Sequence, residues 1–122
     1  MGILRFEDII SWQKARLLTI EIYKIFQNQK DFDFKNQIQR SAVSIMNNIA
    51  EGFERKTNKE FVYFLYMAKG STAEVRSMLY LAKDLNKINN EQFDRLYDLT
   101  MEISRLLSGL INRLNKNTKE NV

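Results

Sequence analysis

Two glutamates in the middle of the sequence are the residues best suited to acid–base or metal chemistry. Glu51 follows Asn47 and Asn48, and Glu74 follows Ser71. Metal sites in helical bundles usually combine such carboxylates with histidines in Glu-x-x-His pairs. The chain contains no histidine and no cysteine, and we find no second carboxylate pair with that spacing. We therefore predict no catalytic residues, no metal site and no cofactor.

The same glutamates fit a structural role. Polar groups within a packed pair of helices need hydrogen-bond partners, and Glu51 and Glu74 could accept from nearby serines or from Arg76. The predicted structural polar network is Arg40, Ser44, Asn47, Asn48, Glu51, Ser71 and Glu74. Gly52 and Gly70 each cost about 1 kcal/mol relative to alanine in a helix interior, so we expect both to allow close helix approach. An enzyme with an unrecognised carboxylate site is a remote alternative, and metal retained through purification would be its sign.

Basic residues form the best functional candidates. Lys69, Arg76 and Lys83 repeat every seven residues, and Lys87 extends the line by one turn. The candidate nucleic-acid-binding residues are Lys69, Arg76, Lys83, Lys87, Arg55, Lys56, Lys59, Arg105, Arg113 and Lys116. Spaced cations suit a phosphate backbone, and exposed tyrosines could stack on bases. The alternative is that these side chains flank a helix seam and lay their stems on apolar surface.

Composition limits the remaining classes. A chain of 122 residues predicts one domain, 1–122. The absence of cysteine fits a reducing cytoplasm, and no apolar run approaches the roughly 20 residues that span a bilayer. The net charge of +4 and the pI of about 9.4 permit an anionic partner such as RNA or DNA. We expect a cytoplasmic protein that does not enter a membrane.

Four helices account for nearly the whole chain, which contains no proline. We predict helices over about 7–27, 35–54, 58–85 and 90–115, with a frayed tail over 116–122. Capping signals support two of these starts: Thr57-x-x-Glu60 before the third helix, and Asn89 or Asn90 before the fourth. Apolar residues recur every three or four positions, which is the pattern of a left-handed bundle seam. The predicted fold is all-α, an up-down-up-down antiparallel four-helix bundle. The predicted seam is Ala15, Leu18, Ile22, Ile25, Ile38, Ala42, Ile45, Ile49, Phe53, Phe61, Leu65, Ala68, Thr72, Val75, Leu79, Ala82, Phe93, Leu96, Thr100, Ile103, Leu107, Leu110 and Leu114.

A second set of apolar residues lies off the seam and leaves the third helix little polar face. Exposed apolar and aromatic patches often mark an interface, so we favour self-association over scattered surface aromatics. The set is Trp12, Leu17, Tyr23, Val62, Tyr63, Tyr66, Met67, Met78, Tyr80, Leu99 and Leu106.

Four segments carry a family resemblance: FEDIISWQKA near the start, RSAVSI, NIAEGFER, and KEFVYFLYMAKGSTAEVRSML. They resemble the four-helix-bundle family encoded by intervening sequences in bacterial 23S ribosomal RNA genes, which is related to the accessory variability proteins of diversity-generating retroelements. The resemblance covers about residues 6–85 and implies homopentamers with a positive surface. For the retroelement relatives it implies binding to a reverse transcriptase and to nucleic acid.

We therefore expect a non-enzymatic, oligomeric protein that associates with structured RNA or an RNA–protein complex. The alternative is a protein-interaction scaffold that docks another protein on its apolar face and does not bind nucleic acid directly. Salt distinguishes the two, because phosphate contacts weaken at high salt while apolar contacts persist.

Overall fold

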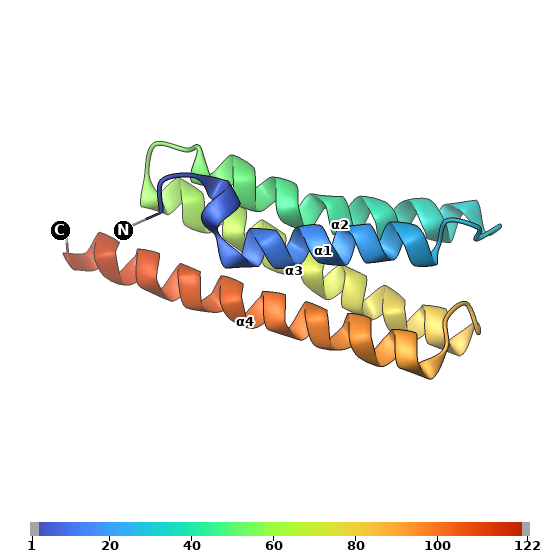
Figure 1. The fold of residues 1–122 in the computed structure, drawn as a ribbon. Helices are drawn as coiled ribbons and strands as arrows, with labels where there is room; N and C mark the ends of the chain where they lie inside the picture. Colours follow the sequence, from blue (N-terminus) through green and yellow to red (C-terminus); the bar gives the residue numbers. More distant parts are fainter. Residues whose placement is uncertain (1–2, 121–122) are drawn as a thin grey trace.

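The chain folds as an all-α four-helix bundle in which each helix runs antiparallel to the next (Figure 1). The computed structural model describes the backbone of residues 3–120 and the side chains of residues 3–116. A short 3-10 turn, η1 (Phe6–Asp8), precedes four helices: α1 (Ile10–Ile25), α2 (Phe32–Phe53), α3 (Asn58–Asp84) and α4 (Asn90–Glu120). Helix α1 packs on α2 and α4, and α3 packs on the same two helices.

Three helix ends differ from the sequence prediction by three residues or more. Helix α1 begins at Ile10, because the residues before it form η1 instead of a first α-helical turn. Helix α2 begins at Phe32, three residues before the predicted start, because the Asp31 carboxylate accepts a hydrogen bond from the Phe34 amide at 3.2 Å and caps the helix. Helix α4 continues through residues 116–120 of the predicted tail; residues 121 and 122 lie outside the described part of the chain.

The predicted caps of α3 and α4 are confirmed. Thr57 Oγ1 accepts from the Glu60 amide at 3.1 Å. Asn89 caps α4 with a reciprocal pair: its Oδ1 accepts from the Gln92 amide at 2.7 Å, and its own amide donates to Gln92 Oε1 at 3.0 Å. Asn86, with φ of 58°, ends α3 in the left-handed conformation that asparagine tolerates well.

The seam forms the core of the bundle. Every predicted seam residue is buried except Ile25 and Phe53, which are partly exposed. The residues off the seam divide into three groups. Val62 and Met78 are buried, which corrects their assignment to an outer face. Trp12, Leu99 and Leu106 are partly buried, whereas Leu17, Tyr23, Tyr63, Tyr66, Met67 and Tyr80 are exposed.

Helices α2 and α3 approach most tightly at Gly52. A Cβ atom at this position would lie 2.7 Å from Phe64 Cβ and 3.0 Å from Phe61 Cδ1, so only glycine fits. The predicted packing reason for Gly52 is therefore confirmed. The same prediction is wrong for Gly70 within one chain, because nothing lies within 4 Å of a Cβ built there.

Candidate nucleic-acid interface

A line of small polar contacts joins α2 to α3. Ser44 Oγ and Ser71 Oγ lie 2.9 Å apart, and Asn48 Nδ2 donates to the Ser44 hydroxyl at 3.0 Å and to its carbonyl at 2.8 Å. Ser41 Oγ donates to a carboxylate oxygen of Glu74. These contacts line an open polar groove of about 600 Å³ formed by Asp33, Asn36, Gln37, Arg40, Ser41, Ser44, Ser71 and Glu74. The polar residues of the RSAVSI segment thus set the register between the two helices.

Three members of the predicted network do not join it. Glu51 is exposed and pairs with Arg55 one turn later, at 2.9 Å. Asn47 is exposed, and Arg40 lines the groove without a hydrogen bond to the other members of the network. The missed member is Ser41, whose spacing of three residues from Ser44 places both hydroxyls on one helix face.

The register also separates the two glutamates. Ser44 faces Ser71 and Gly52 faces Phe64, so Glu51 lies level with the region of Phe64. Glu74 lies ten residues further along α3, which is about 15 Å along a helix. Glu51 and Glu74 therefore cannot act as one carboxylate pair. Within the part of the chain that the structure describes, no three histidine, cysteine, aspartate or glutamate side chains are placed to hold a metal ion.

The basic residues that run along α3 and into the α3–α4 turn contact neighbouring elements of the chain. We call Lys69, Arg76, Lys83 and Lys87 the seam cations. Lys69 Nζ donates to Ser108 Oγ on α4 at 2.9 Å, and Lys83 Nζ lies 4.6 Å from the centre of the Phe93 ring. Arg76 is half-buried, and one terminal nitrogen of its guanidinium is buried without a hydrogen-bond partner.

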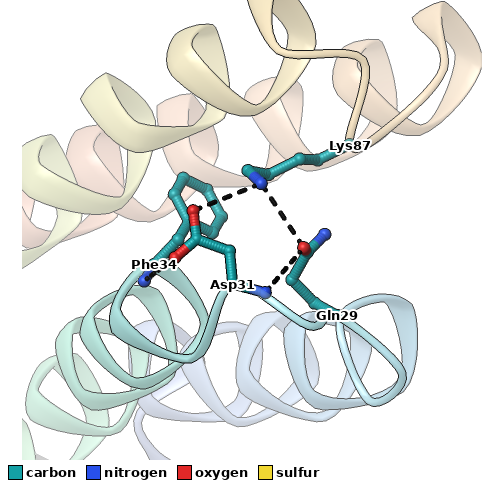
Figure 2. Close-up of polar contacts among 4 residues, drawn as sticks. All are labelled: Gln29, Asp31, Phe34 and Lys87. Carbon is teal, nitrogen blue, oxygen red and sulfur yellow. Dashed lines mark hydrogen bonds and ion pairs between the residues drawn. The ribbon is translucent and has the colours of Figure 1, made fainter.

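Among the described residues, Lys87 is the seam cation that forms an ion pair. Its side chain is 14% exposed and reaches from the α3–α4 turn to the loop before α2 (Figure 2). Lys87 Nζ lies 3.4 Å from both Asp31 Oδ2 and Gln29 Oε1, and 5.4 Å from the centre of the Phe34 ring. A hydrogen bond from the Phe34 amide is the largest single cause that lowers the pKa of the Asp31 carboxyl, and Lys87 lowers it further through a hydrogen bond and through its charge. Lys87 therefore fastens two loops together.

A second group of cations points outward at one end of the bundle. We call Arg55, Lys56, Lys59, Arg113 and Lys116 the end cations, and all five are exposed. The α2–α3 turn and the last turns of α4 lie at the same end (Figure 1). The Lys69–Ser108 contact fixes this register, because moving eight residues along each antiparallel helix brings Phe61 level with Lys116. Among the described residues, Arg55 alone of the five forms an ion pair, with Glu51. Arg105 is also exposed, but it lies halfway along α4.

Next to the end cations is a small pocket with aromatic walls. It measures about 380 Å³ and is lined by Arg55, Lys59, Glu60, Tyr63 and Phe64. Tyr63 and Tyr66 are exposed on this part of α3. Tyr80 is half exposed, but its ring packs against Phe93 and Tyr97, and a hydrogen bond with Tyr97 raises the pKa of its hydroxyl.

These features define the class of protein. It is an antiparallel four-helix bundle with a line of polar contacts between α2 and α3 and a group of exposed cations at one end. Comparison with family models is more specific: residues 7–109 match the model described as 23S rRNA-intervening sequence protein. The chain therefore belongs to the 23S rRNA-intervening sequence protein family, as its sequence motifs predict.

A crystal structure from Bacteroides thetaiotaomicron supports this assignment. It shows a protein of unknown function from the S23 ribosomal protein family, which is 28% identical and superposes with a TM-score of 0.79. The match covers 84% of this chain and 98% of that one. A comparison with functionally curated proteins finds no significant match. Within residues 3–120, no helix is long and apolar enough to cross a membrane.

Proposed function

We propose that this chain is a non-enzymatic, cytoplasmic homo-oligomer that associates with structured RNA through its end cations. The observation that carries the proposal is the gathering of Arg55, Lys56, Lys59, Arg113 and Lys116 at one end of the bundle, all exposed. Four of the five have no ion-pair partner among the described residues and are free to bind phosphates.

The end cations are better placed for this role than the seam cations. Binding a phosphate costs an exposed lysine little beyond side-chain entropy, and it releases counterions from the RNA. Lys69 and Lys87 would first have to give up contacts with Ser108 and Asp31. Contacts with phosphates position a protein on RNA without reading its sequence, so we expect affinity with little sequence preference from these residues.

The test is a titration of the protein into labelled hairpin RNA at several salt concentrations. For wild type, log affinity should fall linearly with log salt. Neutralising Lys56, Lys59 and Arg113 to glutamine should weaken binding at least tenfold at low salt and reduce the slope by about 2–3, because each lost phosphate contact removes roughly 0.7–0.9 from it.

The matched control replaces three seam cations, Lys69, Arg76 and Lys83, by glutamine. It removes the same amount of charge as the first variant, but from a different part of the molecule. This variant should keep most of the wild-type slope. The assignment to the end cations is wrong if the two triple variants lose the same affinity. The RNA proposal itself is wrong if folded wild type does not bind at low salt.

A protein-interaction scaffold is the second candidate, and the exposed apolar side chains of α3 favour it. Tyr63, Tyr66 and Met67 are 63%, 55% and 43% exposed, close together near the start of the helix. Apolar contacts survive salt that dissociates phosphate contacts. Salt-resistant capture of one defined protein partner, together with no binding to RNA, would favour this function.

For self-association, the proposed contact with a second copy is centred on Met67 and Gly70 of α3. Gly70 follows Met67 by about one turn, and open space surrounds its Cβ position. A helical glycine costs about 1 kcal/mol relative to alanine, and the approach of a second backbone would explain it. Light scattering should give the mass of an oligomer, with five copies being the number implied by the family resemblance.

Met67→Glu should dissociate that oligomer while the helical circular dichroism stays unchanged. Leu4→Glu is the matched control, because it places the same charge on a residue that is 86% exposed and lies before η1, outside α3. Monomeric wild type at working concentration would contradict the proposal.

A further inference from the structure

We infer that the pocket beside the α2–α3 turn binds one unpaired guanine base of the RNA. This inference rests on the proposed function and adds to it a base-recognition site. The pocket, of about 380 Å³, is at the small end of the range for ligand pockets, roughly 300–1,000 Å³. It suits a single planar group in size and shape.

The walls of the pocket are stacking surfaces. The Arg55 guanidinium lies 4.7 Å from the centre of the Phe64 ring, and its ion pair with Glu51 holds it there. The Tyr63 ring meets Phe64 edge-on, with centres 5.6 Å apart and planes at 86°. Tyr63 is 63% exposed, so one face of its ring is free. Aromatic rings and arginine planes are the surfaces on which proteins stack splayed-out bases.

Glu60 determines which base fits best. Its backbone amide is used by the Thr57 cap, while its carboxylate has no partner among the described side chains. A carboxylate accepts hydrogen bonds and donates none. The Watson–Crick edge of guanine offers two adjacent donors, its ring N–H and its exocyclic amine, which match the two carboxylate oxygens. Adenine and cytosine offer only the amine at this edge, and uracil only the ring N–H.

The base must be unpaired and unstacked, because pairing occupies its Watson–Crick edge and stacking in a duplex covers its faces. Lys59 lines the pocket, and Lys56 lies in the same turn. Both can contact the phosphates on either side of an extruded nucleotide. The pocket therefore adds selectivity for bulges and loops to the sequence-independent attraction of the end cations.

The test compares three labelled hairpins of one stem sequence: fully paired, with a single guanine bulge, and with a single uracil bulge. Fluorescence anisotropy at moderate salt should show the guanine bulge bound roughly five- to hundredfold more tightly than the paired stem, the range expected from stacking one base. The uracil bulge should fall between them.

Tyr63→Leu should abolish the preference for bulges and leave the salt slope on the paired stem unchanged. Glu60→Gln should reduce the preference for guanine over uracil, because an amide presents only one acceptor oxygen. Tyr66→Leu is the matched control: it removes an exposed tyrosine one turn further along α3, outside the pocket, and should change neither quantity.

The outcomes separate this inference from the proposed function. Equal binding of all three hairpins by wild type, with a steep salt slope, would overturn the base pocket and leave RNA association standing. Absence of binding to every hairpin would overturn both. Loss of the bulge preference in Tyr66→Leu as well as Tyr63→Leu would also overturn the inference, because it would assign the effect to the α3 surface in general.

Discussion

The seam cations and the end cations carry the same charge but occupy different surroundings. Lys69, Lys83 and Lys87 each contact a neighbouring helix or loop of the same chain. Lys56 lies on the α2–α3 turn and Lys59 at the start of α3, and neither contacts anything comparable among the described residues. The first group acts on the stability of the bundle, and the second is available to a partner.

The difference teaches why a regular spacing of charges is a poor guide to a binding surface. Lys69, Arg76 and Lys83 each follow a buried seam residue directly: Ala68, Val75 and Ala82. The seven-residue repeat that aligns them is therefore the repeat of the core. Cations at such positions flank the seam and lay their stems against it.

The largest expected effect on stability is at Gly52, in the last turn of α2, just before the turn that carries Arg55 and Lys56. Gly52→Ala should destabilise the fold by about 2–3 kcal/mol, because the new methyl group meets Phe64 Cβ at 2.7 Å, an atom that side-chain rotation cannot move. Chemical denaturation would measure it. Gly109→Ala is the control: nothing lies within 4 Å of its Cβ position, so it should stabilise by up to about 1 kcal/mol. Equal effects of the two substitutions would contradict the close contact between α2 and α3.

A smaller effect is expected at Lys87, the seam cation that pairs with Asp31. Lys87→Glu should cost about 1–2 kcal/mol of unfolding free energy, because it replaces an attraction to Asp31 by a repulsion in a half-buried setting. Lys56→Glu makes the same change of charge on the exposed turn and should cost less than about 0.5 kcal/mol. Equal losses for the two variants would remove the distinction between seam and end cations.

Sequence reasoning succeeded where short-range rules decide the structure. The caps at Thr57 and Asn89, the seam and the close contact at Gly52 all depend on local spacing or on glycine. It also identified the family from its motifs. Periodicity alone decided the seam, because burial of an apolar stripe leaves few other arrangements.

Sequence reasoning failed where the outcome depends on register between helices. Glu51 and Glu74 occupy similar polar surroundings in the sequence, but the antiparallel pairing places them far apart. Ser41 was missed because its partner, Glu74, lies on another helix. Which cations face inward and which tyrosine borders a pocket likewise depend on neighbours that periodicity does not identify. The open space at Gly70 is a further case, because periodicity does not show which positions of α3 meet a neighbouring helix.

The smallest expected effect is a pH dependence of the stability of the fold that arises from Asp31. It tests what Lys87 adds to the cap of α2. The pKa of this carboxyl lies below its usual 3.8 in the folded chain. The unfolded chain therefore binds a proton more readily than the folded one as the pH falls. The resulting stabilisation is fully present above the unfolded pKa and is lost as the pH falls through the folded pKa.

Asp31→Asn separates charge from capping, because asparagine caps helices about as well as aspartate. The melting temperature of wild type should exceed that of Asp31→Asn at about pH 7, and the difference should vanish once the pH is below the folded pKa of Asp31. The Phe34 amide is the largest single cause of the lowered pKa, and Lys87 adds to it through a hydrogen bond and through its charge. The pH-dependent difference should therefore shrink but persist in a Lys87→Met background. If it disappears there, the ion pair and not the helix cap holds the carboxylate in its charged form.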